Sequence, residues 1–300
     1  MNFTAAELKS LILDRVKLSS TELKEVAASF SKLYCDYQDD AVRRVSVESV
    51  PRTAYTWVDP PTGRTTGVLL FFHGGGYTMG STADHMQLIA SLVHQSGISV
   101  LGIDYRLCPK NRFPAALDDG EEAYRWLLSN HPCRQGIGVS GISAGAFLAT
   151  QLIYRCQETN LPLPTLAVIM SGPRDLDFNS ASCSYNIDRD FVGPERLRNI
   201  RHYYLPEKVD RNSAVLYPAK QIYKSYPRTL FQAGDHEVLL DDSIDFYQRL
   251  RTQGHDVSLQ VIPGLLHCGQ MFSRVFPAGQ FAIEQAARFI QDGLSIEQPQ

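Results

Sequence analysis

The stretch that decides the fold is IGVSGISAGAFLATQLIYR, residues 137–155. It begins with the apolar run IGVS, which is typical of a buried strand, and it ends with AFLATQLIYR, which has a helical pattern. Between them Ser143 stands in the pattern Gly-x-Ser-x-Gly, with Gly141 and Gly145 on its two sides. A serine on a sharp strand-to-helix turn needs small residues two positions away, and Ala144 then presents its N–H at a helix N-terminus. The stretch predicts a nucleophile on a strained turn; the alternative is a tight turn that merely contains a serine.

Short apolar runs and helical patterns alternate on both sides of this stretch. Two early segments, VRRVSVES (42–49) and TAYTWV (53–58), alternate apolar and polar residues as half-exposed strands do. Nearly continuous apolar runs, which fit parallel strands covered on both faces, occupy 68–72, 98–104, 137–141, 166–172, 229–234 and 257–264. Helical patterns occupy 83–95, 117–129, 144–158, 240–253 and 279–291. The alternation predicts an α/β fold over 1–300, a single domain whose mostly parallel central sheet is flanked by helices.

Two segments fall outside the alternation. Residues 1–38 have the pattern of two amphipathic helices that precede the first strand. Residues 173–227 form an insertion that is too long to lack helices of its own, and GPERLRNIRHYY predicts one, with Pro194 near its first turn. We expect the two segments to form a helical cap over the carboxyl edge of the sheet, where α/β folds bind ligands.

The composition argues against several classes of function. A net charge of −3 provides no basic face for nucleic acid. No apolar run approaches the roughly 18 residues that a membrane span requires, and the first residues show no cleavable signal pattern. The six cysteines form no C-x-x-C pair, and neither they nor the histidines have a metal-ligand spacing. We therefore expect a cytoplasmic protein with reduced thiols, no metal, no nucleic-acid partner and no membrane span.

A second motif, HGGG at residues 73–76, directly follows the apolar run 68–72. Consecutive glycines let backbone N–H groups approach a ligand without interference from side chains, although a flexible loop would also explain them. Upstream of the serine turn, the motif predicts an oxyanion hole whose donors are Gly75, Gly76 and Ala144. His73 and Gly74 are expected to support the loop, His73 by hydrogen bonding rather than by proton transfer.

A serine nucleophile needs an imidazole within hydrogen-bonding reach. Of the eight histidines, His267 has the best position, because it lies in a loop just after the last apolar run. The histidines with poorer positions lie on or beside helices, in the insertion, or at the wrong end of a strand: His85, His94, His131, His202 and His255. His267 is therefore the predicted base.

The acid that orients this base is expected at the end of the preceding strand. Two carboxylates, Asp235 and Glu237, follow the run 229–234. His236 between them is not the predicted base, because the expected chain order is serine, acid, histidine. Either carboxylate could instead be an acid at a helix N-terminus, so the residues alone leave both open.

With these motifs, the chain resembles the hormone-sensitive lipase family of α/β-hydrolases, also called the bacterial family IV esterases. The resemblance covers nearly the whole chain and rests on HGGG (73–76), DYRLCPKNRFPAALDD (104–119), GISAG (141–145), AGDHEVLLDDS (233–243) and GLLHC (264–268). It implies the α/β-hydrolase fold with a two-part cap and a small-molecule ester as substrate. It also implies a homodimer formed through the last strand or helix.

Besides Cys108 and Lys110 in the 104–119 segment, two departures from the family pattern bear on the site. The family usually has Asp or Thr immediately before the nucleophile, where this chain has Ile142. The family's D-P-L-R-D stretch aligns with E-V-L-L-D, which implies Glu237 rather than Asp235 as the acid. The exchange is chemically acceptable, because the acid only orients the imidazole and stabilises its charged form.

These observations together predict ester hydrolysis through a serine acyl-enzyme, without a cofactor, and the resemblance favours short- to medium-chain acyl groups. Tyr77, Ile142, Leu266 and Phe191 are expected to line the pocket, the alternative for each being ordinary core packing. Amide, N-acyl or formamide hydrolysis by the same residues is the first alternative, because the motifs do not show the leaving group. A non-catalytic ligand-binding receptor is the second, and it is disfavoured because such relatives lose the histidine that His267 supplies.

Overall fold

The apolar run Val68–Phe72 shows why the sheet is covered on both faces. All five of its residues are buried in strand β3. Val68, Leu70 and Phe72 belong to one apolar core, whereas Leu69 and Phe71 belong to another. Because successive side chains of a strand point to opposite faces, β3 separates two cores. The computed structural model describes residues 2–17, 22–35, 43–47, 54–132 and 136–294.

The described residues form an eight-stranded sheet in the order β1-β2-β4-β3-β5-β6-β7-β8. β2 pairs antiparallel with β1 and with β4, and the other neighbouring strands are parallel. The prediction of a mostly parallel sheet is confirmed, and each predicted run contains a strand; residues 42, 48, 49 and 53 of the first two runs lie outside the described ranges. The strands are β1 (Arg43–Val47), β2 (Ala54–Asp59), β3 (Val68–Phe72), β4 (Ser99–Asp104), β5 (Ile137–Ile142), β6 (Leu166–Met170), β7 (Arg228–Gly234) and β8 (Val257–Ile262).

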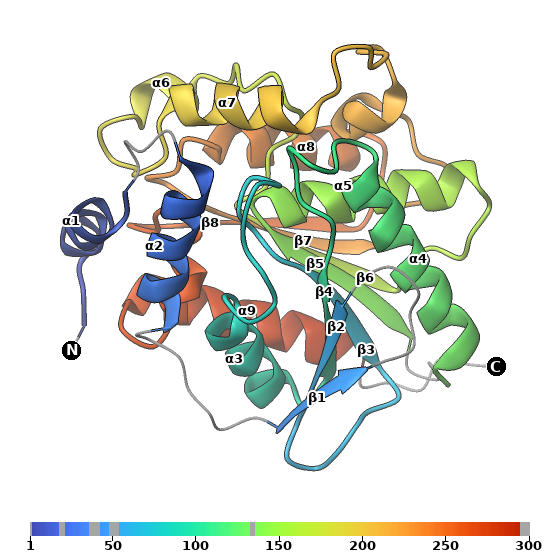
Figure 1. Cartoon of the computed structure of the whole chain (residues 1–300). Helices are drawn as coiled ribbons and strands as arrows, with labels where there is room; N and C mark the ends of the chain where they lie inside the picture. Colours follow the sequence, from blue (N-terminus) through green and yellow to red (C-terminus); the bar gives the residue numbers. More distant parts are fainter. Residues whose placement is uncertain (1, 18–21, 36–42, 48–53, 133–135, 295–300) are drawn as a thin grey trace.

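Helices cover both faces of this sheet (Figure 1). α3 and α9 pack together on one face, and α4, α5 and α8 pack on the other. The helices are α1 (Ala5–Arg15), α2 (Leu23–Cys35), α3 (Met86–Ser96), α4 (Ala115–Asn130), α5 (Ala144–Glu158), α6 (Ser182–Tyr185), α7 (Pro194–Tyr204), α8 (Leu240–Thr252) and α9 (Pro277–Leu294). The helices predicted at both ends of the chain and in the insertion are confirmed, and α7 has Pro194 in its first turn as expected.

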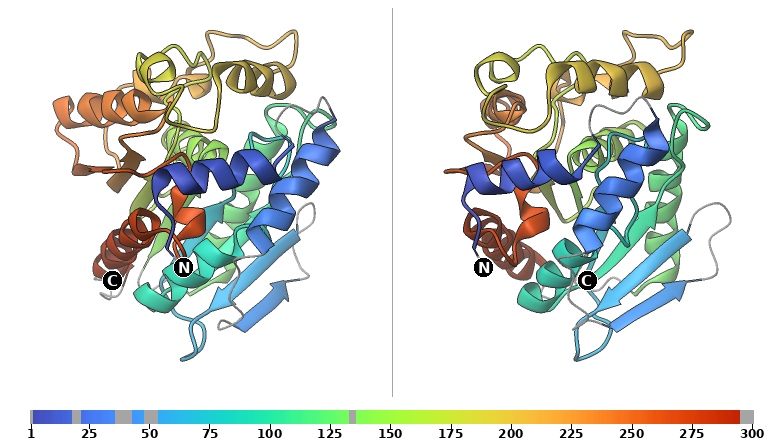
Figure 2. Two further views of the ribbon diagram at one scale, coloured as in Figure 1. Left: turned by 90° about the vertical axis from the view of Figure 1, so that its left-hand side faces the viewer. Right: turned by 60° about the vertical axis from the view of Figure 1, so that its left-hand side comes forward.

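The carboxyl ends of β3, β5, β6, β7 and β8 meet at one edge of the sheet, because these strands are parallel. Figures 1 and 2 show α6 and α7 above this edge and the β1–β2 ribbon at the opposite end of the molecule. α2 also borders a pocket at this edge, together with α7. The loops that carry the predicted functional residues therefore converge on one side of the fold.

Two further expectations from the sequence concern membrane-spanning helices and the state of the cysteines. None of the helices in the described ranges combines the length and the apolar character needed to cross a bilayer. Cys108, Cys156, Cys183 and Cys268 are buried and free. Cys35 and Cys133 fall outside the described side chains.

Candidate active site

Ser143 occupies the turn between β5 and α5, and its backbone has the strained geometry predicted for it. Its φ of 55° and ψ of −121° lie where a side chain is rarely tolerated, so the surroundings must hold the turn in place. A Cβ on Gly141 would collide with the carbonyl oxygen of Gly145, and a Cβ on Gly145 with that of Phe72. The Ser143 N–H donates to the Met170 carbonyl at 2.9 Å. The two glycines are therefore a steric requirement of the turn.

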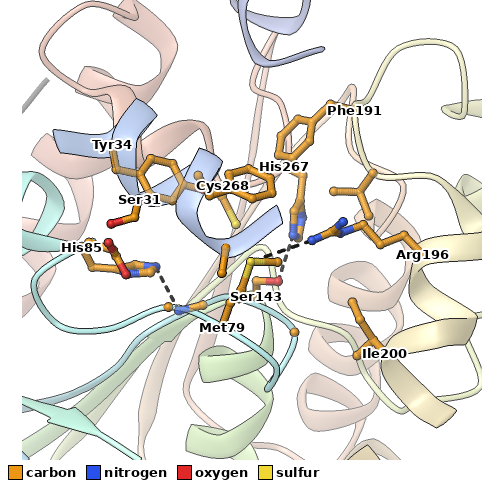
Figure 3. Close-up of a pocket in the computed structure, with 18 of the residues that line it drawn as sticks. Ser31, Tyr34, Met79, His85, Ser143, Phe191, Arg196, Ile200, His267 and Cys268 are labelled. Carbon is orange, nitrogen blue, oxygen red and sulfur yellow. Dashed lines mark hydrogen bonds between the residues drawn. The ribbon is translucent and has the colours of Figure 1, made fainter. Parts of the chain in front are cut away.

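His267 lies in the loop after β8 and contacts the serine directly. Its Nε2 is 2.9 Å from Oγ of Ser143 (Figure 3). The backbone beside the ring is anchored, because the His267 N–H donates to Asp190 at 3.4 Å and the Cys268 N–H donates to Oγ of Ser171 at 3.3 Å. The imidazole is thus held within reach of the hydroxyl proton.

Glu237 lies on the other side of the imidazole and is fully buried. Its Oε2 is 3.5 Å from Nδ1 of His267, and among the described residues neither atom has another hydrogen-bond partner. Its Oε1 accepts hydrogen bonds from Oγ of Ser171 at 2.8 Å and from the Gly234 N–H at 2.7 Å. Burial raises the pKa of Glu237, and the hydrogen bond to His267 acts in the opposite direction. The carboxylate is therefore oriented by its own partners toward the imidazole.

Asp235, the second carboxylate that the sequence left open, has a different position. Its Oδ1 accepts the Gly264 N–H at 2.6 Å, and its side chain is 40% exposed. Asp235 therefore fastens the turn after β8, and Glu237 is the carboxylate that the structure brings to His267.

The charge state of His267 reflects competing influences. Burial favours the neutral ring and would lower the pKa of His267. Cys268, Glu237 and Asp190 outweigh this effect and raise the pKa of His267 well above its usual value. The surroundings thus stabilise the imidazolium that proton removal from Ser143 would create.

The glycine loop after β3 presents backbone N–H groups to the same space. Gly75 and Gly76 line the pocket beside Ser143, and within the described residues their N–H groups have no acceptor. Both have positive φ angles, and a Cβ on Gly76 would lie 2.7 Å from Cδ1 of Ile200 on α7. Ala144, the first residue of α5, has an N–H that the helix leaves unpaired. These are the three donors predicted from the sequence.

Two histidines brace this loop, and burial keeps both neutral. Nε2 of His85 accepts the Gly74 N–H at 3.0 Å, while its Nδ1 lies 3.0 Å from the Ser81 carbonyl. Burial lowers the pKa of His85 to about 3 and the pKa of His73 to about 4. His73 stacks on Tyr105, with ring centroids 4.1 Å apart, and its Nδ1 lies 2.7 Å from the Gly74 carbonyl. The expectation that His73 supports the loop agrees with these contacts.

A pocket of about 70 Å³ opens above Ser143 and His267. Its side walls come from two segments that are far apart in the sequence, α2 and the stretch that contains α7. The α2 wall consists of Ala27, Phe30, Ser31 and Tyr34, and the opposite wall of Phe191, Val192, Arg196, Leu197 and Ile200. The pocket is therefore mostly apolar, with the serine at its base (Figure 3).

Of the four residues expected to line this pocket, only Phe191 does so. Tyr77 has a φ of 61° and stacks on Tyr204, with ring centroids 3.8 Å apart, so its ring lies in the core. Leu266 and Ile142 are fully buried in the other core. These three residues therefore pack in the core, which was the alternative given for each of them.

Several residues that support the site were not anticipated. Ser171 takes a positive φ of 51° directly after β6, which ends that strand and places its Oγ between Glu237 and the Cys268 N–H. Asp190, from the insertion, is buried and also accepts the Val238 N–H at 3.0 Å. Neither residue has a local pattern that distinguishes it from other serines and acids in the sequence, so neither was identifiable before the fold was known.

Comparison with known proteins agrees with this geometry. A family model described as the alpha/beta hydrolase fold matches residues 69–271. An acetyl-hydrolase from Streptomyces hygroscopicus is 34% identical over 249 residues, which cover 82% of each chain. An esterase from Acinetobacter venetianus is 29% identical over 75% of this chain and 74% of its own length.

A solved structure matches this chain over nearly its whole length. It is that of an esterase from the bacterial hormone-sensitive lipase family, with a TM-score of 0.91 at 28% identity. The match covers 97% of this chain and 98% of that one. The chain belongs to the hormone-sensitive lipase family of esterases with the α/β-hydrolase fold.

Proposed function

We propose that the protein hydrolyses carboxylic esters through a covalent acyl-enzyme on Ser143. The observation that carries this function is the 2.9 Å contact between Nε2 of His267 and Oγ of Ser143, at the base of the pocket. An imidazole at that distance can remove the hydroxyl proton as the oxygen attacks a carbonyl carbon. The names of the Streptomyces and Acinetobacter relatives, acetyl-hydrolase and esterase, support the same reaction class.

In the proposed reaction, Oγ of Ser143 attacks the ester carbonyl while His267 takes the proton. The N–H groups of Gly75, Gly76 and Ala144 donate to the oxygen that becomes negative. His267 then protonates the departing alcohol, and in the second half it activates the water that releases the acid. Glu237 fixes the orientation of the imidazole and stabilises its charged form; its 3.5 Å approach to Nδ1 supports that role.

The expected substrates are esters with short- to medium-chain acyl groups. The aromatic and aliphatic residues of α2 and of the α7 segment, which close the space above Ser143 on two sides, support this size limit. We propose that residues 1–38, of which 1, 18–21 and 36–38 lie outside the described ranges, and residues 173–227 act as a two-part cap over the site. The contribution of one pocket wall by each segment supports that assignment.

Turnover of matched chromogenic substrates tests the function. We expect the wild type to hydrolyse p-nitrophenyl acetate and butyrate faster than p-nitrophenyl decanoate, and all three faster than the corresponding p-nitroanilides. Ser143→Ala removes the nucleophile and lowers kcat by about 1,000-fold or more. Ser184→Ala, at an exposed serine, is the matched control and keeps the wild-type rate.

Two results would count against the proposal. Undiminished ester hydrolysis by Ser143→Ala would exclude Ser143 as the nucleophile. Faster cleavage of anilides than of esters would instead favour the amide-hydrolase alternative.

We also propose a cytoplasmic location and a homodimer. The four buried free thiols support a reducing compartment.

β8 is an edge strand of the described sheet, and exposed Val261 on β8 and Phe281 on α9 support a dimer interface there. Sedimentation equilibrium should give a dimer that Val261→Lys converts to a monomer, and a wild-type monomer at every concentration would contradict this arrangement.

A further inference from the structure

One cationic side chain projects into the otherwise apolar pocket. Among the described residues that line the pocket, Arg196 is the one arginine or lysine. It lies on the α7 wall, where it is partly exposed, and Figure 3 shows its guanidinium directed to Met79. Ser143 and His267 line the same pocket. The charge therefore stands in the space that a bound ester would occupy.

Within the described part of the chain, this guanidinium has no carboxylate partner. Its Nη2 is 4.0 Å from Sδ of Met79, and its Cζ is 5.6 Å from the ring centroid of Phe30. Arg201 on the same helix instead forms an ion pair with Asp177 at 3.0 Å. The acidic residue of the pocket, Asp84, accepts a hydrogen bond from Oγ of Ser81 at 2.8 Å and forms no ion pair with Arg196.

An unpaired guanidinium is unfavourable in such surroundings. Burial lowers the pKa of Arg196, which means that the pocket destabilises the charged form. An arginine side chain stays charged nonetheless and presents five N–H donors in a planar fork. Donors that the protein leaves unsatisfied inside a binding pocket remain available to a ligand, and their natural partner is a planar anion.

We propose that Arg196 binds a carboxylate of the substrate, so that the preferred substrates are esters that carry a carboxylate away from the scissile bond. The inference rests on the proposed ester hydrolysis and specifies its substrate class. Arg196 acts here as a specificity-determining residue: it holds the remote anionic group, while the reacting carbonyl lies at Ser143. The apolar residues around it would contact the hydrocarbon chain between the two groups.

Two pairs of esters test the proposal, one for each side of the scissile bond. For the acyl side, the mono-p-nitrophenyl ester of adipate is compared with p-nitrophenyl hexanoate. For the alcohol side, 4-acetoxybenzoate is compared with its methyl ester. For each pair the readout is the ratio of kcat/KM for the anionic ester to kcat/KM for the neutral ester.

Arg196→Met keeps an unbranched side chain but removes the charge. We expect it to lower this ratio by about tenfold or more in at least one pair, chiefly through a higher KM for the anionic ester. The fall in kcat/KM should be smaller for the neutral ester than for its anionic counterpart, and Arg196→Lys should restore part of the preference. Arg198→Met, at an exposed arginine of the same helix, is the matched control and leaves both ratios unchanged.

Two other results would contradict the inference, and they separate its failure from failure of the proposed ester hydrolysis. If Arg196→Met leaves both ratios unchanged, or lowers the rates with anionic and neutral esters equally, Arg196 does not bind a carboxylate and the inference is wrong, although ester hydrolysis stands. If the wild-type protein hydrolyses none of the four esters, the proposed function itself fails, and the inference fails with it.

Discussion

Glu237 and Asp235 are two residues apart, but their surroundings differ, so we expect their substitution to affect activity differently. Glu237 is buried against His267 and helps to raise the pKa of the imidazole, whereas Asp235 accepts the Gly264 N–H at the surface. Since protonated His267 cannot act as a base, activity should fall as the pH drops through this pKa. Removing the Glu237 charge lowers the pKa of His267, so the acidic limb of the profile should move to lower pH.

The expected result for Glu237→Gln is therefore a double change. The acidic midpoint of kcat/KM moves to lower pH, and the plateau falls about 100-fold or more because the imidazolium loses its stabilising anion. Asp235→Asn keeps an acceptor for Gly264 and should leave both the midpoint and the plateau near wild type. The opposite pattern, with Glu237→Gln active and Asp235→Asn inactive, would make Asp235 the acid.

Ile142 is the residue at which the chain departs most clearly from its family pattern. The side chain is fully buried, and its Cγ2 lies 3.4 Å from the position that a Cβ on Gly74 would occupy. It therefore packs beneath the glycine loop, where the family usually has a polar side chain. In this chain the turn before Ser143 is supported by apolar packing on that side.

At the scale of elements, the segment 104–119 acts as a brace for the glycine loop. Oδ1 of Asp104 accepts the Thr82 N–H at 2.6 Å, and the Tyr105 hydroxyl donates to the His73 carbonyl at 2.8 Å. The segment closes on itself through Arg106 and fully buried Asp119, whose carboxylate accepts from the Arg106 backbone at 2.8 Å and from its guanidinium at 2.7 Å. These contacts give the DYRLCPKNRFPAALDD motif a structural role beside the site.

Removing the buried member of this pair should be costly for stability. Asp119→Ala leaves the Arg106 guanidinium and N–H without their acceptor, so we expect the free energy of unfolding to fall by about 3 kcal/mol. Asp118→Ala is the control at the next position, where the ion pair with Arg155 is more exposed and removal should cost about 1 kcal/mol or less. Denaturant unfolding followed by circular dichroism measures both, and equal losses would contradict the role given to Asp119.

Strands and helices could be predicted where the sequence pattern of apolar residues reflects which side chains are buried. The run 68–72 is apolar throughout because both faces of β3 are covered, and α5 begins at Ala144 as predicted because the glycines mark the turn. Tyr77 directly follows the glycines of the HGGG loop, which led us to expect it in the pocket, but its φ is positive and its ring stacks on Tyr204. A single backbone angle of this kind leaves no periodic signal in the sequence.

At the scale of the whole molecule, the pocket depends on segments that meet only after folding. α2 and α7 are separated by more than half of the chain, yet each forms one wall. Arg196 and Arg198 belong to one charged helical stretch, and only the packing of α7 over the site makes the first a pocket residue and leaves the second exposed. The residues of the serine turn and the base could be predicted from motifs, whereas the residues that govern specificity required the fold.

Labelling with a fluorophosphonate, followed by peptide mass spectrometry, tests the central claim most directly. The account predicts one phosphonyl adduct, on Ser143, with loss of p-nitrophenyl butyrate hydrolysis in proportion to the extent of labelling. His267→Ala should label far more slowly, because the hydroxyl then lacks its base. An adduct on another residue with Ser143 unmodified, or full hydrolytic activity in completely labelled protein, would contradict the proposed acyl-enzyme.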